Sequence, residues 1–535
     1  MQTRGMVLFF IGVSFIIQGC NILGPNPPAK AKQSQERPAD PADPAEVAIG
    51  ERLFKETRFA ELFRATSHGN VNARVEGDPV LNQIGDGKTT LTSPFAGQTM
   101  SCVACHFVDQ GNSQGLGMRS YAEFTEKSVI PARADGKTHT PRNSPSLLHA
   151  AAPRNVPSVF HYDGEFVTLD ELVIGGFTGR NFGWMPDQKQ EALDQIVQVI
   201  REDDGSDAVA AEFGALPYRE LLAGKSPRIP KELRLPAEYR IDVLQASDQA
   251  VLNVVARLVS VYLEDLDFSR DEEGHFNGSP YDAFLKKNGI PRGPKSWQSD
   301  DEYTSDLTER VLALKNPKWV SASEGSFSFH QQAFEFGEEE FEGLKLFLRR
   351  KQDPGQSSQF VGNCVACHAA PAFTDYRLHN VGETELQYDT LNGFESFKKL
   401  SIPSLEDRQK GALVPASLDL GAWAVLGNPA MPRSQTAIME LLCPSNSCDP
   451  KANSELAVAT FKTPPLRDLG HSQPYMHTGR HPSLESALLV YVQASNRGKS
   501  GYMRVVDPEV LKMQLNPNAI PPLVKFLKSL NEDYN

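Results

Sequence analysis

The sequence lacks an excess of positive charge, and it lacks an apolar run of transmembrane length. Its formal net charge is −13, which argues against nucleic acid as a partner because binding to phosphates needs a basic surface. No segment beyond residue 17 is long and apolar enough to cross a membrane. What remains is a chain of 535 residues with 40% hydrophobic and 23% charged side chains, which is typical of a soluble globular protein with two or three domains.

The one long apolar run lies at the N-terminus and predicts a lipoprotein signal peptide over residues 1–20. Residues 6–17 are uncharged and apolar and follow an arginine. The run ends in IQGC, which resembles the lipobox of bacterial lipoproteins and predicts lipidation of Cys20; an ordinary signal peptide with a chance cysteine is the alternative. Residues 21–44 are rich in Pro, Ala, Lys and Gln and are predicted to be a flexible tether. We expect a periplasmic, lipid-anchored protein, and Asn21 favours the outer membrane.

Cysteine is scarce, and apart from Cys20 all the cysteines lie in close pairs. Cys443 and Cys448 bound the short segment CPSNSC. In an oxidising compartment this pair is predicted to form a small-loop disulfide. A metal site there would need further ligands, and no histidine lies nearby.

The other four cysteines belong to two copies of the motif CVACH, at residues 102–106 and 364–368. Two thiols three residues apart can reach the two vinyl groups on one edge of a porphyrin, and the adjacent histidine then lies under the iron. A thioredoxin-type CxxC would not need that histidine, and a zinc finger would need a second histidine at finger spacing. The motifs therefore predict two covalent c-type haems, held by Cys102, Cys105, His106, Cys364, Cys367 and His368.

Each haem motif is preceded by one predicted helix and followed, much later, by another. Residues 46–54 and 339–347 share the pattern G-x-x-L-F at helical spacing, as in the first helix of a cytochrome c domain. Matching last helices are expected at 251–263 and 522–530. The pattern indicates an internal repeat of one structural unit.

The repeat continues downstream of the motifs with an offset of 315 residues. FHYDG at 160–164 corresponds to YMHTG at 475–479, and Thr168 then corresponds to Ser483. Both residues precede apolar helical patterns, so both are predicted N-caps.

Further short motifs accompany the repeat: PRNSP at 141–145, FTD at 373–375, HN at 379–380, KTPPLR at 462–467 and PYMH at 474–477. On these residues the chain resembles the bacterial di-haem cytochrome c peroxidase superfamily, which includes the MauG-type enzymes. The resemblance covers most of 45–200 and 335–530.

The resemblance implies an all-α fold with two tandem cytochrome c-type domains, each binding one haem. These domains are expected at 45–289 and 335–535, with an inserted linker at 290–334. The resemblance also implies a calcium ion between the domains, with Asn143, Ser472 and Pro474 as ligands. Asn143 is otherwise a turn residue before Ser-Pro.

The sixth ligand of the second haem is implied at Tyr491. In the superfamily this ligand lies 14 residues beyond the histidine that corresponds to His477, and MauG-type enzymes have tyrosine there. A phenolate is a hard anionic ligand that favours ferric and higher iron states. The alternatives are a buried core tyrosine on a helix over 485–492, with Met503 as the ligand if that helix is shifted.

The sixth ligand of the first haem is less defined by the sequence. No histidine occurs between His106 and His139, and the glycine-rich loop 111–118 ends in Met118. Met118 is either a thioether ligand or a residue lining an open pocket, and in the second case Arg119 is a candidate distal donor.

Two residues depart from the superfamily pattern. Tyr162 replaces the tryptophan that relays electrons between the haems, and Trp184 aligns with the distal glutamate. Without a carboxylate the pocket lacks its usual general acid and base, which argues against efficient peroxidase turnover. Trp184 is then either a hole carrier or a core aromatic residue.

The resemblance favours an enzyme, a di-haem peroxidase or MauG-like oxidase. It would use hydrogen peroxide together with an electron donor such as a small cytochrome c or cupredoxin, or with a protein substrate. It also allows a homodimer. The alternative is a non-catalytic electron-transfer lipoprotein with two six-coordinate haems.

Overall fold

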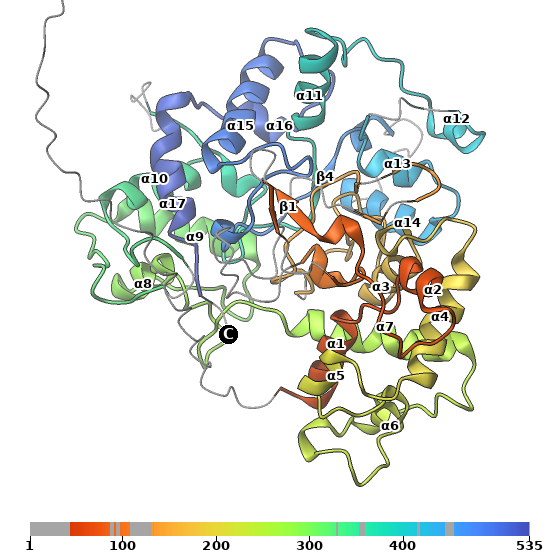
Figure 1. Cartoon of the computed structure of the whole chain (residues 1–535). Helices are drawn as coiled ribbons and strands as arrows, with labels where there is room; N and C mark the ends of the chain where they lie inside the picture. Colours follow the sequence, from red (N-terminus) through yellow and green to blue (C-terminus); the bar gives the residue numbers. More distant parts are fainter. Residues whose placement is uncertain are drawn as a thin grey trace, which may run out of the picture. The chain divides into compact units, whose positions relative to one another are not determined.

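The computed structural model describes residues 43–85, 90–92, 97–106, 130–131, 133–137, 139–152, 154–327, 330–351, 359–412, 414, 418–443 and 454–533. Helices dominate these ranges (Figure 1), and the strands that they contain form only two short antiparallel pairs. Strand β1 (Gln83–Gly85) pairs with β2 (Thr90–Thr92), and β3 (Leu378–His379) pairs with β4 (Phe461–Lys462). The expectation of a helical protein is confirmed. Within the described ranges no helix has the length and apolar character needed to span a bilayer.

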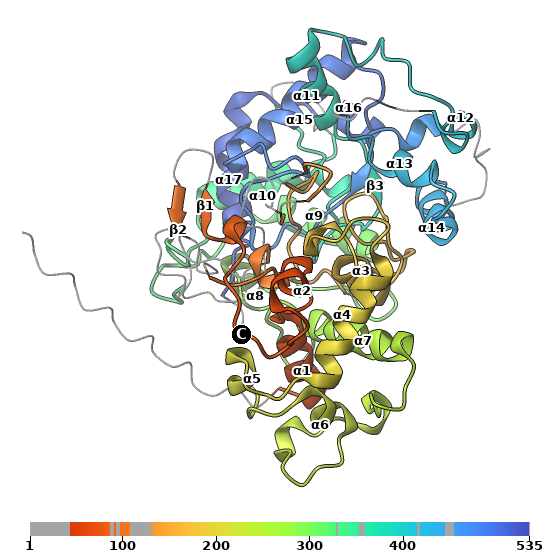
Figure 2. The ribbon, with the colours of Figure 1, turned by 45° about the vertical axis from the view of Figure 1, so that its right-hand side comes forward.

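Two helix pairs form the framework around the haem motifs. Helix α1 (Ala45–Phe54) packs against α7 (Asp248–Asp265), and α10 (Glu338–Leu348) packs against α17 (Ile520–Lys528), as Figures 1 and 2 show. These pairs lie where the sequence predicts the first and last helices of each repeat.

The glycine of each G-x-x-L-F pattern lies at the helix crossing. A Cβ on Gly50 would collide with the main-chain carbonyl of Leu258, and a Cβ on Gly343 would collide with that of Pro522. The leucine and phenylalanine that follow each glycine are buried in the core. The glycine of the pattern is therefore required by a close contact between two helices, because a side chain at this position would clash.

The 315-residue offset also holds in the structure. Phe160 N donates to Phe166 O at 2.8 Å, and Tyr475 N donates to His481 O at the same distance. Thr168 Oγ1 caps α3 (Leu169–Phe177) and Ser483 Oγ caps α15 (Leu484–Lys499), each accepting from the main chain three residues on at 3.2 Å. Both predicted N-caps are confirmed.

The segment 290–334 does not behave as a linker. It contains α9 (Asp300–Ala313), which begins with a capping box at Ser299. Tyr303, Leu307 and Val311 recur every four residues, so they share one helix face, and all three are buried in the same apolar cluster as α10 and α17. The domain boundaries themselves stay a prediction.

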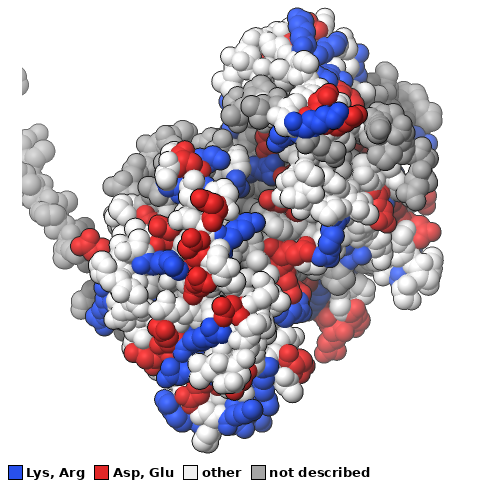
Figure 3. Space-filling model, turned by 90° about the vertical axis from the view of Figure 1, so that its right-hand side faces the viewer, with Lys and Arg blue, Asp and Glu red and all other residues white. Residues whose placement is uncertain are grey.

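A third apolar cluster lies beside the two that contain the haem motifs. It is built largely by residues 378–461, in particular α13 (Ala422–Leu426) and α14 (Pro432–Leu442), and it includes Val159 from the first repeat. The remaining helices are α2 (Glu61–Ser67), α4 (Lys189–Glu202), α5 (Ala208–Glu212), α6 (Tyr218–Ala223), α8 (Pro280–Lys287), α11 (Glu383–Asn392), α12 (Leu405–Gln409) and α16 (Pro508–Lys512). On the face drawn in Figure 3, acidic and basic side chains are interspersed.

Candidate functional site

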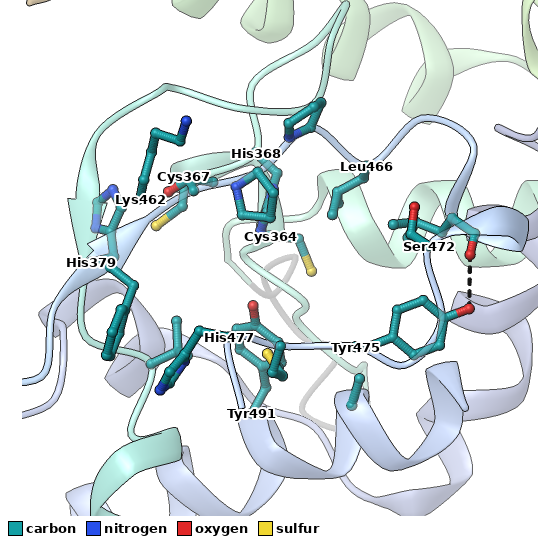
Figure 4. A pocket seen from close by; sticks show the side chains of 18 of the residues that line it. Cys364, Cys367, His368, His379, Lys462, Leu466, Ser472, Tyr475, His477 and Tyr491 are labelled. Carbon is teal, nitrogen blue, oxygen red and sulfur yellow. Dashed lines mark hydrogen bonds between the residues drawn. The ribbon is translucent and has the colours of Figure 1, made fainter. Parts of the chain in front are cut away.

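A cavity surrounds the second CVACH motif (Figure 4). It encloses about 1810 Å³ of atom-free space, part of which is open to solvent. Its walls come from the motif itself, from β4 and the loop that follows, and from α15. Residues of the first repeat, among them Pro145, His161 and Tyr162, complete the lining.

The two CVACH motifs adopt the same local structure. Each begins with a short 3-10 turn, Cys102–Ala104 or Cys364–Ala366. The histidine main-chain N–H then closes on the first cysteine, at 2.9 Å for His106 and 2.8 Å for His368. Neither CxxC pair forms a disulfide, and burial raises the pKa of Cys102 and of Cys364 to about 12. Such thiols are protonated at neutral pH, unlike the activated thiolates of redox-active CxxC pairs.

The motif histidines have the properties of iron ligands. Burial lowers the pKa of each to about 4, against the opposing effect of the main-chain carbonyl of Pro145 on His106 and of Phe373 and Pro464 on His368. His368 Nδ1 donates to Phe373 O at 2.8 Å. A neutral imidazole whose Nδ1 is held in this way presents Nε2 to a metal. His106 Nδ1 is buried with no hydrogen-bond partner among the described residues. Both residues fit the proximal position of a c-type haem.

Tyr491 lies on the opposite wall of the cavity from His368. It projects from α15, and Figure 4 shows its hydroxyl pointing into the cavity. Burial raises the pKa of the Tyr491 phenol, and the nearby thiols of Cys367 and Cys364 raise it further. The Tyr491 hydroxyl makes no hydrogen bond to any described residue, so it can contact a group that is bound in the cavity. Met503, the alternative, does not line the cavity and is buried next to Gly382.

The same helix position in the first repeat is a glycine. With the offset of 315 residues, Tyr491 corresponds to Gly176 in α3. A Cβ on Gly176 would meet no described atom within 4 Å. The two halves therefore differ at the position that faces the second cavity.

Tyr162 and His477 meet where the first repeat contacts the cavity. Their ring centroids are 6.5 Å apart, and His477 stacks on Phe461 with a centroid distance of 3.6 Å. Tyr162 O accepts a hydrogen bond from Lys462 N at 2.7 Å. Tyr162, which the resemblance predicts at the position of the relay tryptophan, thus lines the cavity of the second CVACH motif.

Two of the three predicted calcium ligands lie together. Asn143 Nδ2 donates to Pro474 O at 2.6 Å and to Met476 O at 3.4 Å, while Asn143 Oδ1 is buried without a partner among the described residues. Ser472 lines the nearby cavity, but its hydroxyl donates to Asp468 O at 3.2 Å.

The other predicted site residues lie apart from this cavity or outside the described residues. Trp184 is only 1% exposed, and its Nε1 donates to Phe59 O at 3.1 Å, which is the environment of a core residue. Cys443 is buried and disulfide-bonded. The predictions for Cys20, Met118, Arg119 and Cys448 concern residues that the structure does not describe.

Two partly buried cations beside the cavity were not singled out from the sequence. Lys462 lines the cavity, and burial together with the charge of Arg154 lowers its pKa to about 7. Both cationic groups lie near the ring of Phe160, at 5.8 Å for Lys462 and 5.5 Å for Arg154. Arg154 Nη1 is buried without a partner, and neither cation forms a salt bridge with any described carboxylate. Partly buried cations are stabilised by a nearby counter-charge, and the two propionates of a haem would supply one.

The imidazole of His379 is a third charged group close to the second CVACH motif. His379 lies between two carboxylates, with Nε2 2.8 Å from Asp375 Oδ2 and Nδ1 2.6 Å from Asp507 Oδ2. Burial alone would lower the pKa of His379, but these hydrogen bonds raise it to about 12. The charged imidazole thereby joins the segment after Cys367 to the start of α16.

Known proteins that resemble the chain are haem enzymes. Cytochrome-c peroxidase IdrP2 of Denitromonas iodatirespirans is 25% identical over 170 residues, which are 32% of this chain and 36% of that protein. The methylamine utilization protein MauG of Methylophilus methylotrophus is 25% identical over 169 residues, 32% of either chain. The matched segment thus spans only about a third of these relatives. No protein-family profile matches the chain.

Among solved structures, the di-haem peroxidase BthA from Burkholderia thailandensis E264 is 16% identical, covers 92% of this chain and 86% of its own, and gives a TM-score of 0.41. A MauG-like protein associated with microbial copper homeostasis is also 16% identical, with 92% and 91% coverage and a TM-score of 0.41.

Proposed function

We propose that this chain, a member of the di-haem cytochrome c peroxidase and MauG superfamily, passes electrons between two covalently bound haems and reduces hydrogen peroxide or oxidises a partner. The observation that carries the proposal is the cavity in which His368 and Tyr491 face each other beside a CxxC pair. A second motif of the same local structure supports the second haem.

Different residues of the chain would hold different parts of each haem. The motif cysteines would form thioether bonds, and His106 and His368 would ligate the irons through Nε2. Lys462 and Arg154 would pair with propionates. When bound, the haems supply one-electron exchange. Tyr491 would have to lose its hydroxyl proton to ligate, and Tyr162, in contact with His477, would provide an aromatic path towards the first haem.

The calcium site is also part of the proposal. Amide oxygen and nitrogen are interchangeable by a half-turn of the Asn143 side chain. That turn would place Oδ1, now buried without a partner among the described residues, beside the carbonyl oxygens of Pro474 and Met476. Three converging neutral oxygens suit a hard cation such as calcium.

The test is an electron paramagnetic resonance spectrum of the ferric holoprotein before and after hydrogen peroxide. We expect a high-spin signal from one haem that is lost on reaction with peroxide, and an altered second signal in Tyr491→Phe. Tyr502→Phe is the matched control because Tyr502 is 45% exposed and does not line the cavity. Two low-spin haems that ignore peroxide would instead identify a non-catalytic electron-transfer protein. An unchanged spectrum in Tyr491→Phe would remove the ligand assignment.

Residues 1–20 and Cys20 bear on location, which we propose to be the periplasmic face of the outer membrane through a lipid anchor. A lipoprotein carries several acyl chains, so anchoring would be firm. Cys20→Ser should move the protein from the membrane fraction to the soluble fraction, and a wild-type protein that is already soluble would contradict the anchor.

A further inference from the structure

A chain of hydrogen bonds runs from Tyr376 through His149 to Asp267. Tyr376 Oη lies 2.9 Å from His149 Nε2, and His149 Nδ1 lies 2.6 Å from Asp267 Oδ1. The tyrosine and histidine are 9% and 6% exposed, whereas the Asp267 side chain is 35% exposed. A buried phenol therefore has a buried base in direct contact.

The direction of each hydrogen bond follows from the surroundings of Asp267. Its oxygens also accept from Phe268 N at 2.8 Å and from Arg270 Nε at 3.0 Å, so the carboxylate is an acceptor on all sides. Burial alone would raise the pKa of Asp267, but the His149 contact and these donors lower it to about 2. The His149 proton must then reside on Nδ1, which leaves Nε2 as an acceptor for the Tyr376 hydroxyl.

The three residues join the two repeats next to the second haem motif. Tyr376 follows Asp375, whose N–H donates to Cys367 O at 2.9 Å. His149 lies between Leu148 and Ala150, both of which line the cavity, and its own N–H donates to Leu266 O at 2.9 Å. Tyr376 and His149 also have positive φ angles of 56° and 59°, which are unusual for large side chains and show that the fold imposes this contact.

We propose that Tyr376 is a redox relay, oxidised to a neutral tyrosyl radical while its proton moves to His149. The Tyr376 O–H bond breaks, an N–H bond forms at His149 Nε2, and one electron leaves for a one-electron oxidant. In the protein that oxidant is a haem that has been oxidised by peroxide, so this role rests on the proposed function. Asp267 stabilises the imidazolium, and reduction returns the proton to the phenol.

The charge nearby explains why the proton must move. The guanidinium carbon of Arg154 lies 4.6 Å from the centre of the Tyr376 ring. A positive charge at this distance disfavours a second positive charge on the ring, so oxidation without proton loss is opposed. Tyr303 is a buried tyrosine without such a base: its Oη donates to the main-chain carbonyl of Pro291 at 2.9 Å, and such a carbonyl cannot take the proton.

The experiment generates the oxidant by light, independently of peroxide. A ruthenium(III) polypyridyl complex produced by a laser flash oxidises the di-haem holoprotein, and the sample is frozen for electron paramagnetic resonance. We expect a tyrosyl signal that narrows when ring-deuterated tyrosine is incorporated and that forms more slowly in D₂O. The signal should be lost in Tyr376→Phe and kept in Tyr303→Phe, in which another buried phenol is removed.

Variants of the base distinguish a relay from a structural hydrogen bond. His149→Gln should lower the rate of radical formation by at least about a hundredfold, which is the lower end of what a positioned base contributes, should lower the trapped yield accordingly, and should abolish the D₂O effect. Asp267→Asn, at a more exposed position, should lower the yield less. A signal that persists in Tyr376→Phe, or a His149→Gln protein with the wild-type yield and isotope effect, would overturn the relay.

The two proposals fail separately. If the flash produces the Tyr376 radical but peroxide leaves the haems unchanged, the relay stands and the peroxide function is wrong. If peroxide oxidises the haems but the flash gives no Tyr376 radical in a variant set with full haem content, the relay is wrong and the function stands.

Discussion

Arg467 binds both carboxylate oxygens of Asp282 at 2.9 Å, and neither side chain is more than 1% exposed. Arg467 is the last residue of the KTPPLR motif, and Asp282 lies in α8. The ion pair therefore joins α8 to the loop that lines the cavity. Glu532 lies 3.4 Å from the same guanidinium, and burial raises its pKa to about 8 although Arg467 opposes the shift.

Removal of one partner from this pair should be costly. Asp282→Ala leaves the Arg467 charge buried and only partly compensated, and we expect a loss of about 3–5 kcal/mol in the free energy of unfolding. Urea unfolding of the holoprotein measures it. Asp306→Ala is the control, because the ion pair of Asp306 and Arg310 lies at the surface, is screened by water and should contribute little to stability. Equal losses in the two variants would contradict the assigned role.

The close crossings of α1 with α7 and of α10 with α17 predict which glycine substitutions destabilise the protein. Gly50→Ala and Gly343→Ala each place a methyl group against a main-chain carbonyl, and overpacking of this kind costs about 1–3 kcal/mol. Gly176→Ala adds the same group where no described atom lies within 4 Å, and it should be neutral or stabilising by up to about 1 kcal/mol. Thermal unfolding of the three variants checks the order, and a Gly50→Ala protein as stable as Gly176→Ala would be inconsistent with it.

The His379 imidazolium makes stability depend on pH. Its pKa rises from an ordinary value near 6.5 to about 12 on folding, so the folded state binds the proton more tightly. The stabilisation is fully present below about pH 6.5 and is lost as pH rises towards 12. Between pH 7 and 10 the wild-type protein should lose stability by up to about 1 kcal/mol per pH unit relative to His379→Gln. Parallel pH profiles for the two proteins would exclude a charged His379.

Lys462 should set the potential of the second haem. A cation next to a haem favours the ferrous state, so Lys462→Met should lower the midpoint potential, by up to about 60 mV, a tenfold change for a one-electron couple. Potentiometric titration followed by visible absorption measures the shift. The control is Lys410→Met, since the Lys410 side chain is 68% exposed. Equal potentials in wild type and Lys462→Met would show that the lysine does not pair with the haem.

Features of the fold that depend on neighbouring residues could be predicted from the sequence, whereas contacts between residues far apart in the chain could not. The caps Thr168 and Ser483 and the repeated G-x-x-L-F helices depend on residues a few positions apart, and each is confirmed. The contact of His149 with Tyr376 spans 227 residues and that with Asp267 spans 118, and no local pattern encodes such a meeting. The burial of Lys462 is likewise a property of packing.

The candidate site shows the same difference between features that the sequence predicts and features that it does not. The spacing of 14 residues from His477 identified Tyr491 as a ligand candidate, and the structure places it across the cavity from His368, although ligation itself stays a prediction. Within the predicted linker 290–334, the buried face of α9 was not foreseen because composition describes the average polarity of a segment and not the one helix face that packs.

The correspondence of Tyr491 with Gly176 gives a duplicated scaffold whose two copies differ at the helix position that faces the cavity. Because hairpin, cap and helix recur at a constant offset, a residue moved from one copy to the other should arrive in an equivalent orientation. Specialisation of the halves would then need no change of architecture, only the gain or loss of a single donor atom on α3 or α15. A tyrosine introduced by Gly176→Tyr would test whether the two copies are exchangeable parts.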